Sequence, residues 1–245
     1  VIADDGGDWA SNIVLSNYTA STRRHYWIHN APSTASVNAG KFELRTSATT
    51  TAAQIGGQGS GSTVLLNVDS SGNVYIVDRE NHRVMKWEPG ANEGAVVCGT
   101  GTGGSTNSQL SNPEGIYVDS SGNIYVADKD NNRVMKWDSG SSSGTIVAGG
   151  NGAGSATNQL SSPRGIHVDS SENIYISDSN NNRIMKWASG ASEGSVVAGG
   201  NGEGNGLNQL YDPRGINVDS DGNIYIADFD NYRVSKWVPG ASQGI

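Results

Sequence analysis

YVADKDNNRVMKW, at residues 125–137, is the stretch that decides the fold, because the chain repeats it. Close copies stand at 75–87, 175–187 and 225–237. The spacing is 50 residues without insertion, since aspartates recur at positions 69, 119, 169 and 219 and tryptophans at 87, 137, 187 and 237. A fixed period of this length is typical of a propeller or a solenoid.

One repeat contains four candidate strands. Residues 115–119, 123–128, 133–137 and 145–149 carry alternating apolar positions, and polar or Ser/Gly-rich turns separate them. Alternation with a period of two, bounded by turn residues, predicts β-strands. Four antiparallel strands in each unit favour a propeller blade over a solenoid coil, which would use fewer and shorter strands. The sequence therefore predicts an all-β propeller.

Two longer strings carry a resemblance to a known family. NPEGIYVDSSGNIYVADKDNNRVMKW (112–137) and SPRGIHVDSSENIYISDSNNNRIMKW (162–187) resemble NHL repeats, whose pattern is P-x-G-(I/V)-x-V-D, then G-x-(I/V/L)-(Y/W)-V-(A/S)-D, then N-x-R-(I/V). The resemblance extends over residues 64–245. It implies a β-propeller, which in this family commonly has five or six blades.

The residues that recur in every copy are expected to hold the blades. Ile124 and Tyr125 point to opposite sides of a strand, so both faces of a blade bury apolar surface. Trp137 adds an anchor whose burial contributes roughly 4–6 kcal/mol as an upper bound. Asp128 and Arg133 flank a polar bend, and we expect the carboxylate to bind the bend amides and the guanidinium.

The number of blades follows from counting strands. Repeats at 64–100, 114–150 and 164–200 are complete, whereas the fourth repeat, from Pro213, stops before its last strand. Residues 1–7 read like residues 196–202, a fourth strand and its glycine loop. Between them, residues 8–63 hold four apolar runs that predict a diverged blade, at 12–15, 25–28, 41–44 and 52–57. We predict one five-bladed propeller over residues 1–245, with residues 1–7 as the strand that closes the seam and 64–245 as four NHL-like repeats, the last incomplete.

The seam at Val1, Ile2 and Ala3 has two outcomes. If these residues return to the last blade of their own chain, the propeller closes on itself. If they pair with another copy, each chain donates a strand and a homo-oligomer or an open-ended filament follows. A tethered strand competes at a roughly millimolar effective concentration, which favours closure within one chain.

Composition excludes several classes of partner. The chain has a net charge of −8 and a pI of about 4.9, which disfavours nucleic acid and anionic membranes. No run reaches the roughly 18 apolar residues of a membrane span, so we expect no membrane insertion. The single cysteine, Cys98, excludes an intrachain disulfide framework. A first residue other than Met suggests a processed or truncated chain.

No catalytic constellation is evident, so we expect neither catalytic residues, nor a metal, nor a cofactor. Some propellers that resemble NHL repeats are zinc-dependent lyases with several convergent histidines. Here His82 and His167 lie in different repeats at different strand positions, and His25 and His29 lie outside the regular repeats. The stretch 219–223 reads as a β-turn, because it lacks the spacing and the closing Glu of a calcium loop. Cys98 replaces the alanines of the other repeats and is expected to be a small core residue.

Binding residues are expected where the repeats differ, since positions that hold the fold are copied. Four columns change chemical type: 64, 114, 164 and 214; 67, 117, 167 and 217; 79, 129, 179 and 229; and 82, 132, 182 and 232. In propellers the first strand lines the central channel, and the bend after the second strand shares a face with the connection between blades. The predicted ligand or partner site contains Glu114, Arg164, Arg214, Phe229 and Tyr232 on that face, with Tyr117 and His167 in the channel. The alternative is neutral surface variation.

We therefore expect a non-enzymatic, extracellular structural or protein-interaction module, whose partner is protein, either another copy or a different chain. Asn17-Tyr18-Thr19 is a sequon that predicts a glycan if the chain is secreted. Two alternatives stay open. One is a carbohydrate-binding, lectin-like propeller, which would bind glycans through aromatic and amide groups at the bends. The other is a metal-dependent lyase or a lactonase-like hydrolase.

Overall fold

In the computed structural model, the backbone is described for residues 13–15, 35–38, 41–44, 53–55 and 66–245, and the side chains for residues 66–245. The described residues fall into two compact units. One unit contains residues 77–85 and 96–245. The other contains the four N-terminal strands together with residues 66–76 and 86–95.

Three repeats form four-stranded sheets with the strands in chain order, as predicted for propeller blades. A single 3-10 turn joins the second strand of each sheet to the third. The first sheet contains β5 (Leu66–Val68), β6 (Val74–Asp78), η1 (Arg79–Asn81), β7 (Arg83–Trp87) and β8 (Ala95–Gly99). The second contains β9 (Ile116–Val118), β10 (Ile124–Asp128), η2 (Lys129–Asn131), β11 (Arg133–Trp137) and β12 (Thr145–Gly149). The third contains β13 (Pro163–Val168), β14 (Ile174–Asp178), η3 (Ser179–Asn181), β15 (Arg183–Trp187) and β16 (Ser195–Gly199).

The fourth repeat forms a three-stranded sheet, which confirms that it stops before its last strand. It contains β17 (Pro213–Val218), β18 (Ile224–Asp228), η4 (Phe229–Asn231) and β19 (Arg233–Trp237). Ile245 begins the pairing that a fourth strand would continue, since its backbone N–H and carbonyl both hydrogen-bond to Lys236. The chain is thus an all-β propeller with four repeat blades.

The N-terminal unit contains a further sheet in the order β1 (Ile13–Leu15), β2 (Ala35–Asn38), β3 (Lys41–Leu44) and β4 (Ala53–Ile55). Three of these strands lie within predicted runs. The run at 25–28 lies outside the described residues, and β2 was not predicted. β1 pairs with β2 in parallel, unlike the antiparallel pairs of a blade. A parallel pair needs a crossover of a dozen or more residues, and the long interval between β1 and β2 supplies that length.

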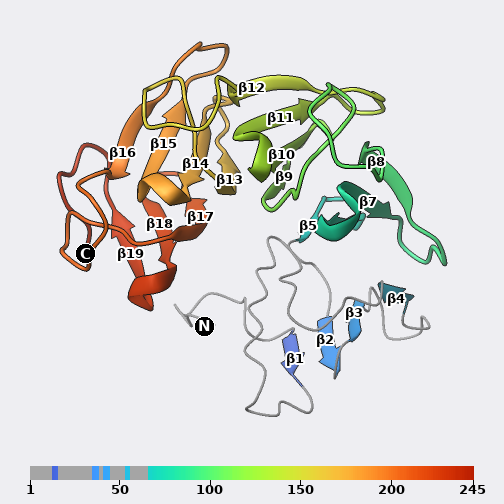
Figure 1. The fold of residues 1–245 in the computed structure, drawn as a ribbon. Coiled ribbons are helices and arrows are strands. Elements are labelled where there is room, and N and C mark those ends of the chain that lie inside the picture. Colours follow the sequence, from blue (N-terminus) through green and yellow to red (C-terminus); the bar gives the residue numbers. More distant parts are fainter. Residues whose placement is uncertain (1–12, 16–34, 39–40, 45–52, 56–65) are drawn as a thin grey trace. The chain divides into compact units, whose positions relative to one another are not determined.

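Neighbouring blades in the larger unit pack face to face. Tyr125 and Val134 of the second blade share an apolar cluster with Ile174, Met185 and Trp187 of the third. A second cluster joins the third blade to the fourth in the same way. The first strands, β9, β13 and β17, lie side by side (Figure 1). The prediction that both faces of a strand bury apolar surface is therefore confirmed.

The recurring Arg and Asp form an anchor at each bend. Arg133 Nε lies 2.7 Å from Asp128 Oδ2, with side chains 5% and 0% exposed. Asn131 Nδ2 donates to the same carboxylate at 2.8 Å, and the backbone N–H of Ser111 donates to its other oxygen at 2.6 Å. Burial raises the pKa of the Asp128 carboxyl, and these donors oppose that rise. The predicted pairing is confirmed.

The guanidinium also binds a loop that sequence reasoning did not assign to it. Arg133 Nη1 and Nη2 donate to the carbonyl oxygens of Ser105, Thr106 and Gln109 at 2.8, 3.0 and 3.1 Å. Arg183 and Arg233 repeat this arrangement on their own preceding loops. In these three blades the anchor therefore fixes the glycine-rich loop that enters the blade.

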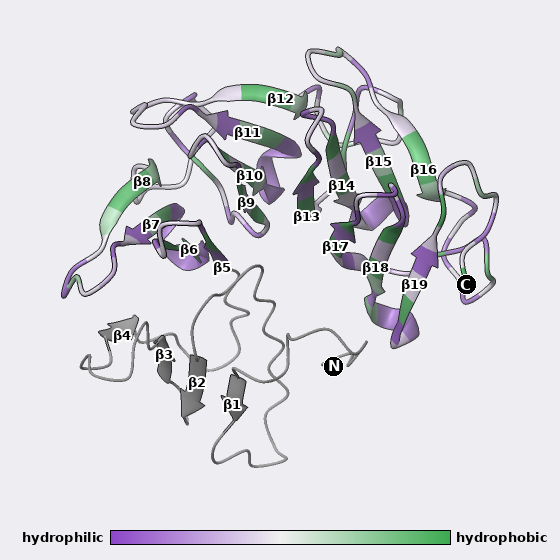
Figure 2. Cartoon of the chain, turned by 180° about the vertical axis from the view of Figure 1, so that it is seen from behind, coloured by the Kyte–Doolittle hydropathy of each residue, from purple (hydrophilic) through white to green (hydrophobic). Residues whose placement is uncertain are grey.

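Apolar residues also lie on the outermost strands, as Figure 2 shows for β12 and β16. Ile146 and Val196 on these strands are 47% and 46% exposed. The helices in the described part of the chain are single 3-10 turns, none of them with the length and apolar character of a membrane span.

Several predictions fall on positions outside the described residues. These are the seam residues Val1, Ile2 and Ala3, the sequon at Asn17, the histidines at 25 and 29, and position 64 of the first variable column. The fifth blade, the closing strand, glycosylation and the extracellular location stay predictions.

Candidate functional site

The candidate site lies where the loop before each first strand meets the 3-10 turns. The residue after each turn has a left-handed backbone, with φ of 52°, 52°, 51° and 54° at His82, Asn132, Asn182 and Tyr232. Asn132 Oδ1 accepts a hydrogen bond of 3.0 Å from the backbone N–H of Ser162 in the next blade. Asn182 makes the same bond to Asp212 at 2.9 Å. This column therefore links the blades.

His82 takes the place of asparagine at the first junction. Its Nδ1 accepts from the backbone N–H of Asn112 at 3.0 Å, so this nitrogen carries no proton. A Cβ on Gly103 would lie 3.1 Å from His82 Nε2, which shows how closely the imidazole fits against the loop. The column of His82, Asn132 and Asn182 was predicted to belong to a variable ligand face. In the structure it links neighbouring blades at three junctions.

Two glycines bring the first strands of neighbouring blades close together. A Cβ on Gly115 would lie against the carbonyl oxygen of Arg164, and one on Gly165 against that of Arg214, both far inside van der Waals contact. Neither glycine has a positive φ, so the requirement is for space. The glycine of the P-x-G motif therefore sets side by side the residues that precede it, Glu114, Arg164 and Arg214.

These residues belong to a chain of charges that extends over the repeat blades. Glu114 lies 3.4 Å from Arg79 Nη1, 3.6 Å from Lys129 Nζ and 3.5 Å from Arg164 Nη1. Arg164 Nε lies 3.6 Å from Asp212, whose other oxygen lies 2.7 Å from Arg214 Nη2. We name these six residues the charge network.

The charge network ends on an aromatic ring. The guanidinium carbon of Arg214 lies 3.3 Å from the centroid of the Phe229 ring, a cation–π contact. Asp212 holds the same guanidinium through Nε at 2.9 Å and Nη2 at 2.7 Å. Arg214 is therefore fixed from two sides while its side chain stays 33% exposed.

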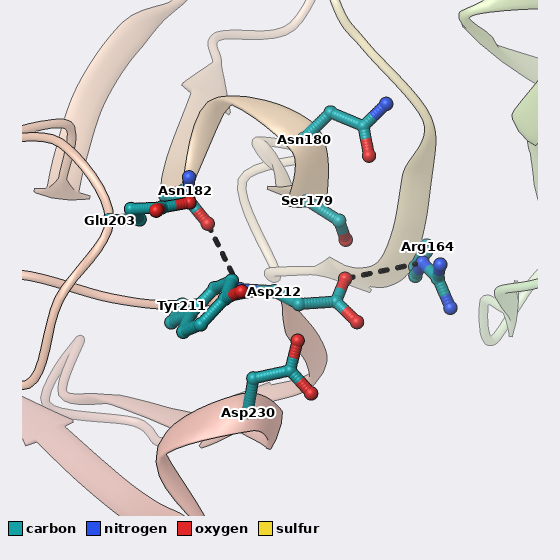
Figure 3. A pocket seen from close by; sticks show the side chains of 8 residues that line it. All are labelled: Arg164, Ser179, Asn180, Asn182, Glu203, Tyr211, Asp212 and Asp230. Atoms are coloured by element: carbon teal, nitrogen blue, oxygen red, sulfur yellow. Dashed lines mark hydrogen bonds and ion pairs between the residues drawn. The ribbon is translucent and has the colours of Figure 1, made fainter.

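A hollow adjoins the network between the third and fourth blades. Arg164 and Asp212 line it together with Ser179, Tyr211 and Asp230. Figure 3 shows Asp212 directed towards Arg164, with the Asp230 carboxylate beside it. The hollow therefore borders the charge network at Arg164 and Asp212.

Tyr117 and His167, which the sequence predicts to line the channel, form a separate group. The rings of Tyr117 and His167 lie 5.3 Å apart, and each lies 6.4 Å from a tyrosine of its own blade, Tyr125 and Tyr175 respectively. Burial raises the pKa of the Tyr117 hydroxyl, as do Asp119 and Asp169. The structure thus places the Tyr117 and His167 rings next to each other, with aromatic contacts separate from the charge network.

The outcome for the remaining predicted residues is mixed. Glu114, Arg164, Arg214 and Phe229 do converge. Tyr232 is 84% exposed and takes no part in the charge network. Sequence reasoning missed Asp212, which joins the two arginines. The signal was available, because its column reads Asn112, Ser162 and Asp212.

The described residues hold no group of three His, Cys, Asp or Glu side chains that is arranged to bind a metal ion. Cys98 is buried at 2% exposure, and burial raises the pKa of its thiol far above the ordinary value. A buried neutral thiol is a packing residue and a poor nucleophile.

Comparisons with known proteins identify the repeats. Residues 110–137, 160–187 and 210–237 match the NHL repeat. Solved structures with a similar fold include a nidogen/laminin complex, at 18% identity and a TM-score of 0.60, covering 84% of this chain and 70% of that chain. An auxiliary nutrient binding protein from Bacteroides thetaiotaomicron is 17% identical with a TM-score of 0.55, covering 70% and 46%. A streptogramin B lyase is 16% identical with a TM-score of 0.50, covering 81% and 58%.

At these identities the likeness is one of fold alone. The chain spans about half the length of the nutrient binding protein and of the lyase, at 46% and 58%. A sequence search of curated proteins found no match.

Proposed function

The chain is an NHL-repeat β-propeller protein, and from that premise we propose that it is a protein-interaction module rather than an enzyme. Its docking face is the charge network with Phe229. The proposal includes the sequence-based prediction that the protein works outside the cell.

One observation carries the proposal. Four residues that differ from their counterparts in the other repeats, Glu114, Arg164, Arg214 and Phe229, converge on one face. At the position of Arg164, the second blade has Glu114 and the fourth has Arg214. Structural needs common to all blades do not account for a change of charge at equivalent positions. A face whose residues differ from blade to blade suits a single asymmetric partner.

The chemistry of the face supports a protein partner. Arginine and aromatic side chains are enriched among the interface residues that contribute most of the binding energy between proteins. Arg214 and Phe229 form such a pair, because the guanidinium stacks on the ring. A propeller of similar fold occurs in a nidogen/laminin complex, an assembly of two proteins.

Partner capture tests the proposal. Wild-type protein and the double variant Arg164→Ala/Arg214→Ala are immobilised, and the retained proteins are compared by mass spectrometry. The control, Lys136→Ala/Lys186→Ala, removes the same charge at lysines that lie over Tyr125 and Tyr175. We expect at least one protein to be retained by the wild type and the control and lost from the arginine variant. Equal retention by all three, with unchanged melting temperatures, would refute the docking face.

We further propose that a strand pairs with β19, which offers an open edge within the described residues. Val234 of β19 is 46% exposed, whereas Val134 and Ile184 at equivalent positions are fully buried. Those two residues pair with Ala148 and Ala198 of the fourth strands. An open edge with an exposed β-branched residue is a template for pairing.

The sequence assigns Val1, Ile2 and Ala3 to this edge, and the fifty-residue period sets Ala3 opposite Val234. With Cys98→Ala as background, the pair Ala3→Cys/Val234→Cys is expected to form a disulfide. The control Ile2→Cys/Val234→Cys is not, because successive side chains of a strand point to opposite faces. A monomeric product indicates closure within one chain and a ladder of oligomers indicates strand donation. Equal cross-linking of both pairs, or none, would disprove the register.

A further inference from the structure

Three cations from three blades converge on one carboxylate at the centre of the charge network. Arg79, Lys129 and Arg164 surround Glu114 at 3.4, 3.6 and 3.5 Å. Their side chains are 35%, 16% and 19% exposed, and that of Glu114 is 12% exposed. The cluster is therefore half-buried and reachable from solvent.

The distances from Glu114 to its three cations are longer than those of strong charge-assisted hydrogen bonds. Charge-assisted hydrogen bonds are typically about 2.7–2.9 Å, and the Arg133 and Arg214 pairs of this chain reach 2.7 Å. Three atoms of the cluster are buried yet make no hydrogen bond to any described residue: Arg79 Nε, Arg164 Nε and Glu114 Oε1. Buried polar atoms without a partner call for an explanation, such as a water or a bound ion. The two guanidinium Nε groups are donors without an acceptor, whereas Glu114 Oε1 is an acceptor that an anion cannot satisfy.

The charge balance indicates what kind of group would pair with these donors. The charge network has four cations and two anions, which leaves two positive charges. Asp212 is already held by Arg214 at 2.7 Å, and Asp130 lies 4.0 Å from Lys129 with its side chain 43% exposed. Two further carboxylates, Asp230 and Glu203, line the hollow beside Asp212. The positive excess is therefore confined to Arg79, Lys129 and Arg164 around Glu114.

We propose that Arg79, Lys129 and Arg164 form a binding site for an oxyanion, specifically a phosphate monoester carried by the docking partner. Glu114 keeps the three cations in place until the phosphate binds. Guanidinium groups offer parallel N–H donors that match phosphate oxygens, and an ammonium adds a compact charge. A phosphate monoester carries about −1.5 to −2 charges near neutral pH, which matches the local excess.

The proposal deepens the proposed function, because it takes the same face as the docking face. Its test needs no protein partner. Phosphate binding and partner capture are measured separately, so failure of phosphate binding leaves the docking face standing, whereas failure of capture leaves the anion site standing.

Calorimetric titration with inorganic phosphate at constant ionic strength tests the site. We expect binding to the wild type and binding tighter by about tenfold or more to Glu114→Gln, because the competing carboxylate charge is removed. Arg164→Ala is expected to weaken binding by about tenfold or more, since a charged hydrogen-bonding partner is lost. Lys136→Ala, which removes a lysine that pairs with Asp138 outside the cluster, is expected to bind like the wild type.

The melting temperature of each variant is recorded with and without phosphate. If Glu114→Gln is less stable because three cations repel one another, phosphate is expected to restore its melting temperature, and sodium chloride of equal ionic strength is not. Heat of binding absent from both the wild type and Glu114→Gln would overturn the proposal. Equal losses in Arg164→Ala and Lys136→Ala would also overturn it, and acetate binding as tightly as phosphate would overturn the assignment to phosphate.

Discussion

Replacing Arg133 by alanine is expected to lower the free energy of unfolding by about 3–5 kcal/mol, the range for breaking a buried ion pair from one side. The change leaves the Asp128 carboxylate, which is 0% exposed, without its guanidinium. It also leaves the carbonyl oxygens of Ser105, Thr106 and Gln109 without a donor. The loop that enters the blade and the bend that leaves β10 lose their common anchor.

The matched control is Arg83→Ala, which breaks the equivalent pair in the first blade. There the Arg83 and Asp78 side chains are 32% and 12% exposed, so water replaces part of what is lost. We expect a distinctly smaller destabilisation than for Arg133→Ala. Urea unfolding followed by tryptophan fluorescence gives both values. Equal effects, or an Arg133→Ala protein as stable as the wild type, would show that the anchor does not hold the blade.

Replacing Gly165 by alanine is expected to destabilise the protein by about 3 kcal/mol, at the upper end of the range for overpacking. The added methyl group would press on the backbone carbonyl of Arg214, which has no rotamer to move away. β13 and β17 would have to separate. Arg164 and Arg214, which stand on those strands, would move with them, so phosphate binding is expected to weaken as well.

Gly190→Ala separates crowding from backbone strain. Gly190 has a φ of 74° with nothing within 4 Å of an added Cβ, so alanine there costs only the left-handed backbone, about 1–2 kcal/mol. Gly165 has the opposite combination, with no positive φ and a blocked Cβ. The two variants are compared by the same urea titration. If Gly165→Ala proves no more destabilising than Gly190→Ala, the close approach of the first strands does not limit the packing of the blades.

Much of the fold could be predicted because the same pattern of apolar alternation and turn residues occurs four times in the sequence. The predicted strands at 133–137 and 145–149 have the bounds of β11 and β12, and 123–128 differs from β10 by one residue. Apolar alternation and turn residues determine such strands locally, and the copies confirm one another. Residues 8–63 carry no such period, and there β2 and its parallel pairing were not predicted.

The site could be predicted only in part, because columns of a repeat show which positions vary and not what their side chains reach. The column of Asn132 and Asn182 varies, yet these residues accept hydrogen bonds from the next blade. Tyr232 belongs to the same column and is exposed. Asp212 joins Arg164 to Arg214 across a blade boundary, a contact that no spacing along the sequence indicates.

The central claim is that Glu114, Arg164, Arg214 and Phe229, which differ from their counterparts in the other repeats, build one binding face with its strongest point at Glu114. A crystal structure determined with phosphate at a concentration well above its measured dissociation constant tests this claim most directly. We predict tetrahedral density within hydrogen-bonding distance of Arg79, Lys129 and Arg164, with the Glu114 carboxylate displaced. Phosphate bound elsewhere, with Glu114 still held by all three cations, would contradict the account.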